Sequence, residues 1–382
     1  MPTITNISRI IALVLTTLST FAYPKIAPNA GISRVISKWD GRPLNSTLNL
    51  LSWPHDFTTG IQPLPLQSHN DFERPHPLFD ALSVGCTAFA ADIVPQVGDL
   101  EGQILVAHDS SEVDVGRTLQ SLYIDPLLTI LDHANVGRRD GDMIRGVYDD
   151  EPEQSVTLFL DLKDEPSPEL WEALNRAVQP LADRGYLTFW TADDTMETDE
   201  ASSSVTNLTS PITGAGRLHV RPITLAGTGE TPFPLILNAS PNATHRHIFM
   251  DAPLISFLDP PSGPFDLADK STYTYDPSTS HTASACLFHH SVSLGDSIPL
   301  IFGIVTSAQR RRIQTLVIAA QQRGLKARFW GIKGLPVART AVWRVLMEEM
   351  GMGDAVGRRE AGGYLVVDEI DVAAGIMRAM DE

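Results

Sequence analysis

Histidines and aspartates stand at the ends of short apolar runs in the first half of the chain. His69 follows the run that ends at Ser68, and Asp92 lies in the next run. His108 follows the third run, and Asp161 ends the fourth. Two histidines with carboxylates suffice for metal-assisted phosphoryl chemistry, in which one imidazole removes a proton and the other protonates the leaving oxygen. The metal expected beside the carboxylates is a hard cation, Mg²⁺ or else Ca²⁺, because both prefer oxygen ligands.

A lysine accompanies the last of these residues. Lys163 lies two positions after Asp161, and residues two apart on a strand point to the same side, so both would face one cavity. There Lys163 would neutralise charge on a bound phosphate. Taken singly, a histidine after a strand is more often a loop residue, and an aspartate there is more often a helix cap. Four such residues at the same ends of four successive strands favour a site.

The apolar runs are rich in Val, Ile, Leu, Phe and Thr and are typical of strands covered on both faces. The strands expected are 64–68, 88–94, 104–107, 156–162, 218–225, 247–250, 325–330 and 364–367. Helical segments are expected at 76–84, 118–133, 166–184, 308–323 and 337–350. Ser167 is a candidate helix cap, and Gly324 and Gly351 stand just past two helix ends.

This alternation favours the α/β class and a closed (β/α)8 barrel, a TIM barrel, whose active site forms at the C-terminal strand ends. A doubly wound open sheet is the alternative. The barrel is expected over residues 61–382, with loop insertions at about 191–216 and 259–300. Residues 23–60 are expected to form an N-terminal extension.

The N-terminus predicts a signal peptide over residues 1–22. Arg9 precedes an apolar run too short to span a bilayer, and Ala22 is a small residue at a plausible cleavage point. The expected address is therefore the secretory pathway or the cell exterior, without a stable membrane span after cleavage. An uncleaved anchor and a mitochondrial presequence are less favoured. Asn-x-Ser/Thr triplets agree with a secreted glycoprotein and begin at Asn45, Asn207, Asn238 and Asn242.

The net charge of −17 argues against nucleic acid and anionic membrane surfaces as partners. A phosphate-bearing small molecule or lipid would need a metal or a locally positive pocket to bind. Cys86 and Cys286 either form one disulfide or are two buried thiols. The oligomeric state stays open.

Other motifs are weaker. The segment Gly227-Thr228-Gly229 could present backbone N–H groups to a phosphate, but a plain turn is the simpler explanation. The pairs His245/His247 and His289/His290 lack thiolate or acidic companions at a spacing that would predict a zinc site.

Several segments resemble the altered inheritance of mitochondria protein 6 family. They read Gln-Ser-His-Asn-Asp, Pro-Leu-Phe-Asp-Ala-Leu, Arg-Thr-Leu-Gln-Ser-Leu-Tyr-Ile-Asp-Pro-Leu, Asp-Ala-Pro-Leu and Arg-Phe-Trp-Gly, at 67–71, 77–82, 117–127, 251–254 and 328–331. The resemblance runs from about residue 63 to 370. It implies a phospholipase-C-like phosphodiesterase barrel, related to glycerophosphodiester phosphodiesterases and spider-venom sphingomyelinase D. Those relatives use two catalytic histidines and a metal held by a Glu-x-Asp pair and a further acid.

Carried over by position, the resemblance gives each residue a role. His69, His108 and Lys163 would be catalytic, Asp92 and Asp161 would hold the metal, and Asn70 and Trp330 would bind substrate. For Trp330, a packed core tryptophan is an equal alternative.

The chain departs from the relatives at two positions. Ala90 stands where they carry the Glu of Glu-x-Asp, so a metal-directed carboxylate is lost, and Gly331 stands where an acid is expected. One lost charged interaction is worth on the order of 1.5–3 kcal/mol, or roughly 10–100-fold in affinity. We therefore expect a phosphoric diester hydrolase with weakened metal binding, acting on a glycerophosphodiester or phospholipid headgroup. The alternative is a decayed barrel that binds a phosphate-bearing ligand or has a structural role.

Overall fold

A computed structural model of the chain describes residues 30–37, 53–95, 102–192, 216–237, 245–258, 279–286, 304–332, 336–353 and 361–380. The expected signal peptide, the four Asn-x-Ser/Thr asparagines, His289/His290 and most of both expected insertions lie outside the described residues. So does most of the expected N-terminal extension, of which a short helix, α2 (Gly31–Ser37), is described.

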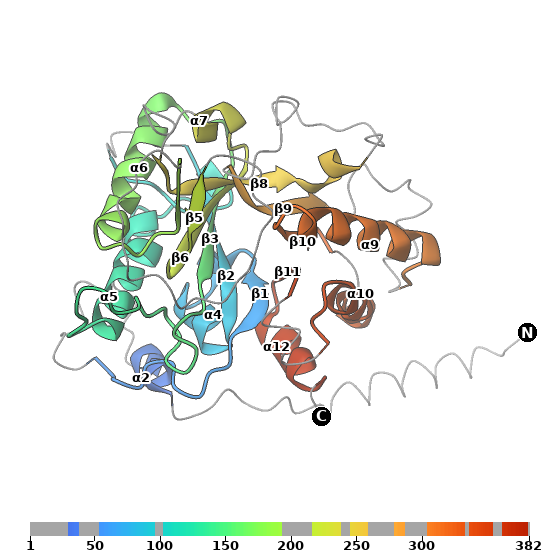
Figure 1. Cartoon of the computed structure of the whole chain (residues 1–382), viewed down its shortest axis with the longest axis horizontal. Coiled ribbons are helices and arrows are strands. Elements are labelled where there is room, and N and C mark those ends of the chain that lie inside the picture. Colours follow the sequence, from blue (N-terminus) through green and yellow to red (C-terminus); the bar gives the residue numbers. More distant parts are fainter. Residues whose placement is uncertain are drawn as a thin grey trace, which may run out of the picture.

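The described residues confirm the closed barrel. Eight parallel strands close on one another in the order β1-β11-β10-β9-β8-β6-β3-β2 (Figure 1). Their bounds are β1 Leu64–Ser68, β2 Cys86–Ile93, β3 Val156–Leu162, β6 Ile223–Gly229, β8 Ile248–Pro253, β9 Ser280–Cys286, β10 Lys326–Trp330 and β11 Gly363–Val367. Every residue of β1, β2 and β11 is buried, as expected for parallel strands that pack on the barrel interior on one face and on helices on the other.

Helices alternate with these strands. α5 and α6 lie on one side of the barrel, and α9 and α10 lie on the opposite side (Figure 1). The helix bounds are α4 Phe79–Ser83, α5 Asp125–Ala134, α6 Pro168–Asp183, α7 Phe233–Leu237, α9 Ser307–Gln321, α10 Pro336–Glu349 and α12 Ile370–Arg378. Shorter helical turns are η2 Asp71–Glu73, η3 Ser110–Glu112, η4 Gln120–Ile124 and η5 Leu254–Phe257.

The predicted helix caps are confirmed. The Ser167 hydroxyl accepts a hydrogen bond from the backbone N–H of Leu170 at the start of α6, at 3.2 Å. Gly324 and Gly351 have φ of +69° and +75° past the ends of α9 and α10, a conformation that costs glycine little because it has no Cβ.

The predicted strand list is wrong at three places. Residues 104–107 form isolated bridges, Ile93 with Val106 and Leu105 with Thr118, and add no strand to the barrel. The eighth strand of the barrel is instead β9, which was not predicted because its Ser- and Ala-containing sequence lacks an apolar run. The expected strand 218–225 is divided between β5 and β6.

A small antiparallel sheet accompanies the barrel. Its strand order is β5-β4-β7, with bounds Arg217–His219, Phe189–Thr191 and His245–Arg246. Cys86, at the start of β2, is a buried free cysteine, which favours the thiol alternative over a disulfide. None of the described helices is both long and apolar enough to span a membrane.

Candidate active site

The ends of β2 and β3 bring four of the predicted residues together. Asp92 lies near the end of β2, with 1% of its side chain exposed, and its Oδ2 is 3.3 Å from Nδ1 of His108. His108 reaches it from the bridged segment after β2, because the N–H of Ala107 bonds to the carbonyl of Asp92 at 3.0 Å. The prediction that His108 ends a barrel strand is therefore wrong, but the bridged segment still brings His108 to Asp92, another residue of the predicted site.

Lys163 joins the two carboxylates. Its Nζ lies 2.7 Å from Asp92 Oδ2 and 2.8 Å from Asp161 Oδ2. The register explains the contact, because Asp92 and Asp161 are directly paired across β2 and β3 and therefore point to the same side. Lys163 and Asp161 therefore point to the same side, as their spacing of two residues predicts.

Charge and burial oppose each other in this cluster. Burial is the largest cause that raises the pKa of Asp92, and the charge of Asp161 adds to it, while Lys163 opposes it. For Lys163, burial alone would lower the pKa, but the two carboxylates raise it above its usual range. Lys163 is thus held in its charged form by the two carboxylates, whereas ionisation of Asp92 is unfavourable because its carboxyl group is buried.

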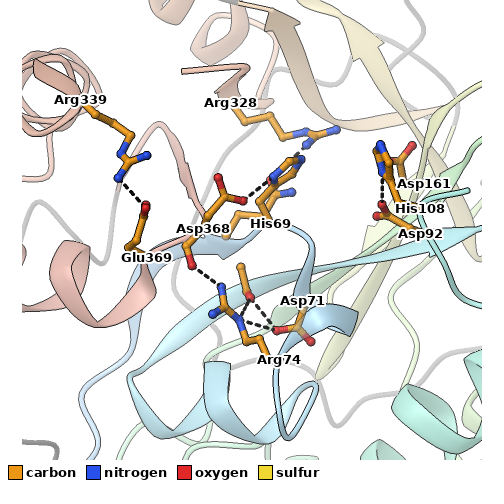
Figure 2. A network of polar contacts seen from close by, with 12 residues as sticks. His69, Asp71, Arg74, Asp92, His108, Asp161, Arg328, Arg339, Asp368 and Glu369 are labelled. Atoms are coloured by element: carbon orange, nitrogen blue, oxygen red, sulfur yellow. Dashed lines mark hydrogen bonds and ion pairs between the residues drawn. The ribbon is translucent and has the colours of Figure 1, made fainter. Parts of the chain in front are cut away.

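His69 has a carboxylate partner that the sequence did not reveal. It follows β1, and its Nδ1 lies 2.9 Å from Oδ1 of Asp368, which follows β11 (Figure 2). The two strands are neighbours in the barrel, with Ser68 paired to Val367, so the residues after them meet at the same end. The hydrogen bond with His69 is the main cause that holds the pKa of Asp368 below its usual value. The two positions lie 299 residues apart. The contact could therefore be predicted only from the pairing of β1 with β11, which closes the barrel.

A partly buried polar network supports this histidine. Arg74 donates to the carbonyl of Asp368 at 2.8 Å and to the hydroxyl of Ser68 at 2.7 Å (Figure 2). The same hydroxyl donates to fully buried Asp71 at 2.6 Å, and Asp71 also accepts from Tyr123 at 3.1 Å. The network ties the end of β1 to the end of β11.

A second buried ion pair lies inside the barrel. Arg328 of β10 and Asp251 of β8 are joined at 2.5 Å, with side chains 5% and 0% exposed. Burial alone would raise the pKa of Asp251, but the Arg328 guanidinium holds it below its usual value. Thr228, Thr282 and Ser284 donate their hydroxyls to the same carboxylate at 2.6–3.0 Å. The motifs that contain Asp251 and Arg328 are part of the family resemblance, but the sequence does not show that these two side chains form an ion pair.

The structure shows the surroundings of Ala90 and Gly331, the two positions at which the chain departs from the relatives. Ala90 is buried in an apolar cluster inside the barrel that includes Phe159 and Tyr364, so it faces inward as Asp92 does. Gly331 has φ +74°, and an acidic residue would be strained in that conformation. The segment with Gly227 and Gly229 ends β6, and a Cβ on Gly229 would stand 2.2 Å from Asp161 Oδ1. The glycine therefore makes room for Asp161.

The two residues expected to bind substrate are also at strand ends. Trp330 ends β10 and is 40% exposed, so the core alternative is wrong. Asn70 follows β1 in the left-handed conformation, φ 46° and ψ 40°. Its Oδ1 is buried and finds no hydrogen-bond partner among the described residues.

The donor set fits a hard cation with few protein ligands. Asp92 Oδ1 is buried and, within the described part of the chain, has no hydrogen-bond partner. Asp161 supplies a second carboxylate on the adjacent strand. Mg²⁺ is commonly held by one or two carboxylates with water and substrate phosphate. Among the described residues, no group of three or more His, Cys, Asp or Glu is placed to hold a metal ion, so water and substrate phosphate would have to supply the remaining ligands.

The fold is a closed parallel TIM barrel with histidines and carboxylates near the C-terminal ends of its strands. Comparison with known proteins shows which family the chain resembles. Residues 55–206 match an AIM6-like phosphodiesterase domain. The chain is 29% identical to altered inheritance of mitochondria protein 6 homolog of Arthroderma benhamiae, over 78% of this chain and 82% of that protein. It is 30% identical to altered inheritance of mitochondria protein 6 of Saccharomyces cerevisiae, over 72% of this chain and 63% of that protein. The expected resemblance to this family is confirmed, and residues 55–206 match its phosphodiesterase-like domain.

A looser likeness is to phosphatidylinositol-specific phospholipase C from Listeria monocytogenes. The identity is 10%, the match covers 87% of this chain and 97% of that chain, and the TM-score is 0.40. A likeness at this level shows neither a substrate nor a mechanism. The match to the Saccharomyces relative covers less than two thirds of that protein's length.

Proposed function

We propose that the chain is a phosphoric diester hydrolase that acts on a glycerophosphodiester or a phospholipid headgroup. The observation that carries the proposal is a pair of histidines near the C-terminal ends of the barrel strands, each with Nδ1 beside a carboxylate: His69, which follows β1, with Asp368, and His108, from the bridged segment after β2, with Asp92. The phosphodiesterase-like domain supports the same reaction class.

The two histidines suit acid–base catalysis. Because Nδ1 of each ring is oriented by a carboxylate, Nε2 is the nitrogen that can exchange a proton with substrate. One imidazole takes the proton of the attacking hydroxyl, either of water or of the substrate itself. The phosphorus–oxygen bond to the leaving alcohol breaks, and the other imidazole, His69 or His108, protonates that oxygen.

Asp92 and Asp161 would hold Mg²⁺ or Ca²⁺, which when bound polarises the phosphate oxygens. Lys163, fixed between them at 2.7 and 2.8 Å, would neutralise charge on the phosphate. Asn70 and Trp330 would contact the rest of the substrate. With Ala90 in place of a carboxylate, metal affinity is expected to be lower by roughly 10–100-fold.

The test is turnover by purified mature protein over a series of Mg²⁺ concentrations. Glycerophosphocholine and a lysophospholipid serve as the two substrate classes, with the released alcohol and phosphomonoester as readouts. We expect weak, Mg²⁺-stimulated turnover of one class. No turnover at any Mg²⁺ concentration, together with turnover gained by Ala90→Glu, would indicate a decayed enzyme.

A second candidate is a barrel that binds a phosphate-bearing ligand without turning it over. It is favoured by the ion pairs through which Lys163 already neutralises both carboxylates, and by Ala90. Calorimetric titration separates the two candidates. Binding of Mg²⁺ near physiological concentration favours the enzyme, whereas binding of inorganic phosphate without Mg²⁺ binding favours the ligand-binding barrel.

A further inference from the structure

We infer that His245 and His247 form a second metal site, one that takes a divalent transition metal such as Zn²⁺, Cu²⁺ or Ni²⁺. The two residues lie at the edge of the small sheet, on and just after β7. Residues two apart on an extended chain point to the same side, so both imidazoles leave the backbone in the same direction.

The ring geometry is that of a chelating pair. Nε2 of His245 and Nε2 of His247 lie 2.9 Å apart. Two nitrogens bound to one metal at about 2.0–2.1 Å stand roughly 2.9–3.4 Å apart, depending on whether the angle at the metal is square or tetrahedral. The ring centroids are only 4.4 Å apart, less than a head-on contact of the two nitrogens would leave between them. The rings therefore meet at an angle, as they would around a shared ion.

The pair is held in place by its neighbours. The ring of Phe189 on β4 stacks on His245, with centroids 4.9 Å apart, and His219 of β5 stacks on Phe189 at 4.5 Å. Side chains fixed by packing lose little freedom when they bind an ion. Neutral imidazole is the form that binds a metal.

The donors set the kind of metal. Imidazole nitrogen suits Zn²⁺, Cu²⁺ and Ni²⁺, whereas Mg²⁺ prefers oxygen. No third His, Cys, Asp or Glu joins the pair as a metal-binding group within the described ranges. Water or an incoming ligand would fill the remaining positions, which makes this an open site, chemically distinct from the carboxylates at the barrel mouth.

The test uses the untagged full chain, stripped of metal with a chelator and titrated with Zn²⁺ in excess Mg²⁺. We expect one saturable Zn²⁺ site whose affinity falls at least tenfold in His245→Asn and in His247→Asn. His76→Asn removes a histidine elsewhere, and Asp92→Asn alters the barrel mouth; both should bind Zn²⁺ as the parent does. Thermal unfolding checks that each variant is folded.

Electron paramagnetic resonance of the parent chain with one equivalent of Cu²⁺ gives a second readout that does not depend on the variants folding. Coupling to two imidazole nitrogens is expected. Zn²⁺ affinity that is the same in the parent and in the two pair variants, or a copper spectrum without two coupled nitrogens, would overturn the inference and leave a hydrogen-bonded pair of rings.

Discussion

At the barrel mouth, each proposed catalytic histidine is oriented through the same ring nitrogen. Nδ1 of His69 lies 2.9 Å from Asp368, and Nδ1 of His108 lies 3.3 Å from Asp92. The carboxylates differ in environment, since Asp92 is 1% exposed and Asp368 is 57% exposed. Removing either carboxylate should therefore impair catalysis, with different effects on stability.

Asp368→Asn is expected to lower turnover by tenfold or more, but by less than the roughly 10²–10⁴-fold contribution of a general acid or base. An amide orients His69 less well and stabilises its charged form less. The pKa of Asp368 is lowered, chiefly by the hydrogen bond with His69. The stabilisation is therefore present above the unfolded value of about 3.9 and is lost as pH falls through the lower folded value.

The stability difference between the parent and Asp368→Asn should accordingly shrink as the pH falls below about pH 4. Urea unfolding at a series of pH values measures it, and a phosphodiester assay measures turnover. A variant with parental turnover would show that His69 needs no orienting carboxylate.

Asp92→Asn should abolish most activity without loss of stability. Burial, followed by the charge of Asp161, raises the pKa of Asp92, so its contribution to stability is present below the unfolded value of about 3.9 and is lost as pH rises through the folded value. At neutral pH the charge is a cost, and Lys163 keeps Asp161 as its partner. We expect a melting temperature equal to or above that of the parent and turnover reduced about 100-fold or more. A clearly lower melting temperature would contradict this account.

At the scale of elements, the ends of the strands determine which side chains meet. The direct pairing of β2 with β3 aligns the two carboxylates, and the pairing of β1 with β11 joins His69 to Asp368. The end of β6 leaves space for Asp161, because Gly229 has φ +63° and no side chain to collide with that carboxylate.

Gly229→Ala should therefore damage the site as well as the fold. A Cβ there would lie 2.2 Å from Asp161 Oδ1 and 2.3 Å from the carbonyl of Leu162. Gly351→Ala is the matched control, since Gly351 has φ +75° and nothing within 4 Å of the added Cβ. Both variants pay roughly 1–2 kcal/mol for the left-handed conformation. Only Gly229→Ala should lose further stability and most Mg²⁺-stimulated turnover, and equal effects in the two variants would contradict the packing argument.

The ion pair of Arg328 and Asp251 links β10 to β8 inside the barrel. Asp251→Ala leaves a buried guanidinium unpaired and should lower the free energy of unfolding by about 3–5 kcal/mol. The double variant Asp251→Leu, Arg328→Met removes both charges and should recover much of that loss. Denaturant unfolding measures both, and a double variant less stable than the single one would show that the pair itself is strongly stabilising.

For the whole molecule, the sequence predicted the architecture better than the strand list. The barrel and β1, β3 and α6 followed from apolar runs and caps, because such local signals depend on neighbours in sequence. β9, with its Ser and Ala residues, and the contact of His69 with Asp368 depend on closure of the barrel, which single-sequence patterns do not show. The positions of His69, Asp92, His108 and Asp161 at the expected strand ends, with Lys163 two residues after Asp161, predicted a site, and the family resemblance then assigned a role to each residue.

The expected passage of the chain through the secretory pathway can also be tested. We propose that residues 1–22 are removed as a signal peptide and that the asparagines of the four triplets receive glycans. N-terminal sequencing of secreted protein should begin near Tyr23, and glycosidase treatment should lower its apparent mass. Retention of the full chain inside cells without glycans would contradict the secretory route.

The most direct test of the central claim is hydrolysis of a glycerophosphodiester at saturating Mg²⁺ by the parent chain, His69→Ala and His108→Ala. Phosphorus magnetic resonance follows conversion of the diester to the phosphomonoester. We predict Mg²⁺-stimulated turnover by the parent and a loss of roughly 10²–10⁴-fold in each variant. Turnover that persists in both folded variants would contradict the claim that these two histidines carry out the reaction.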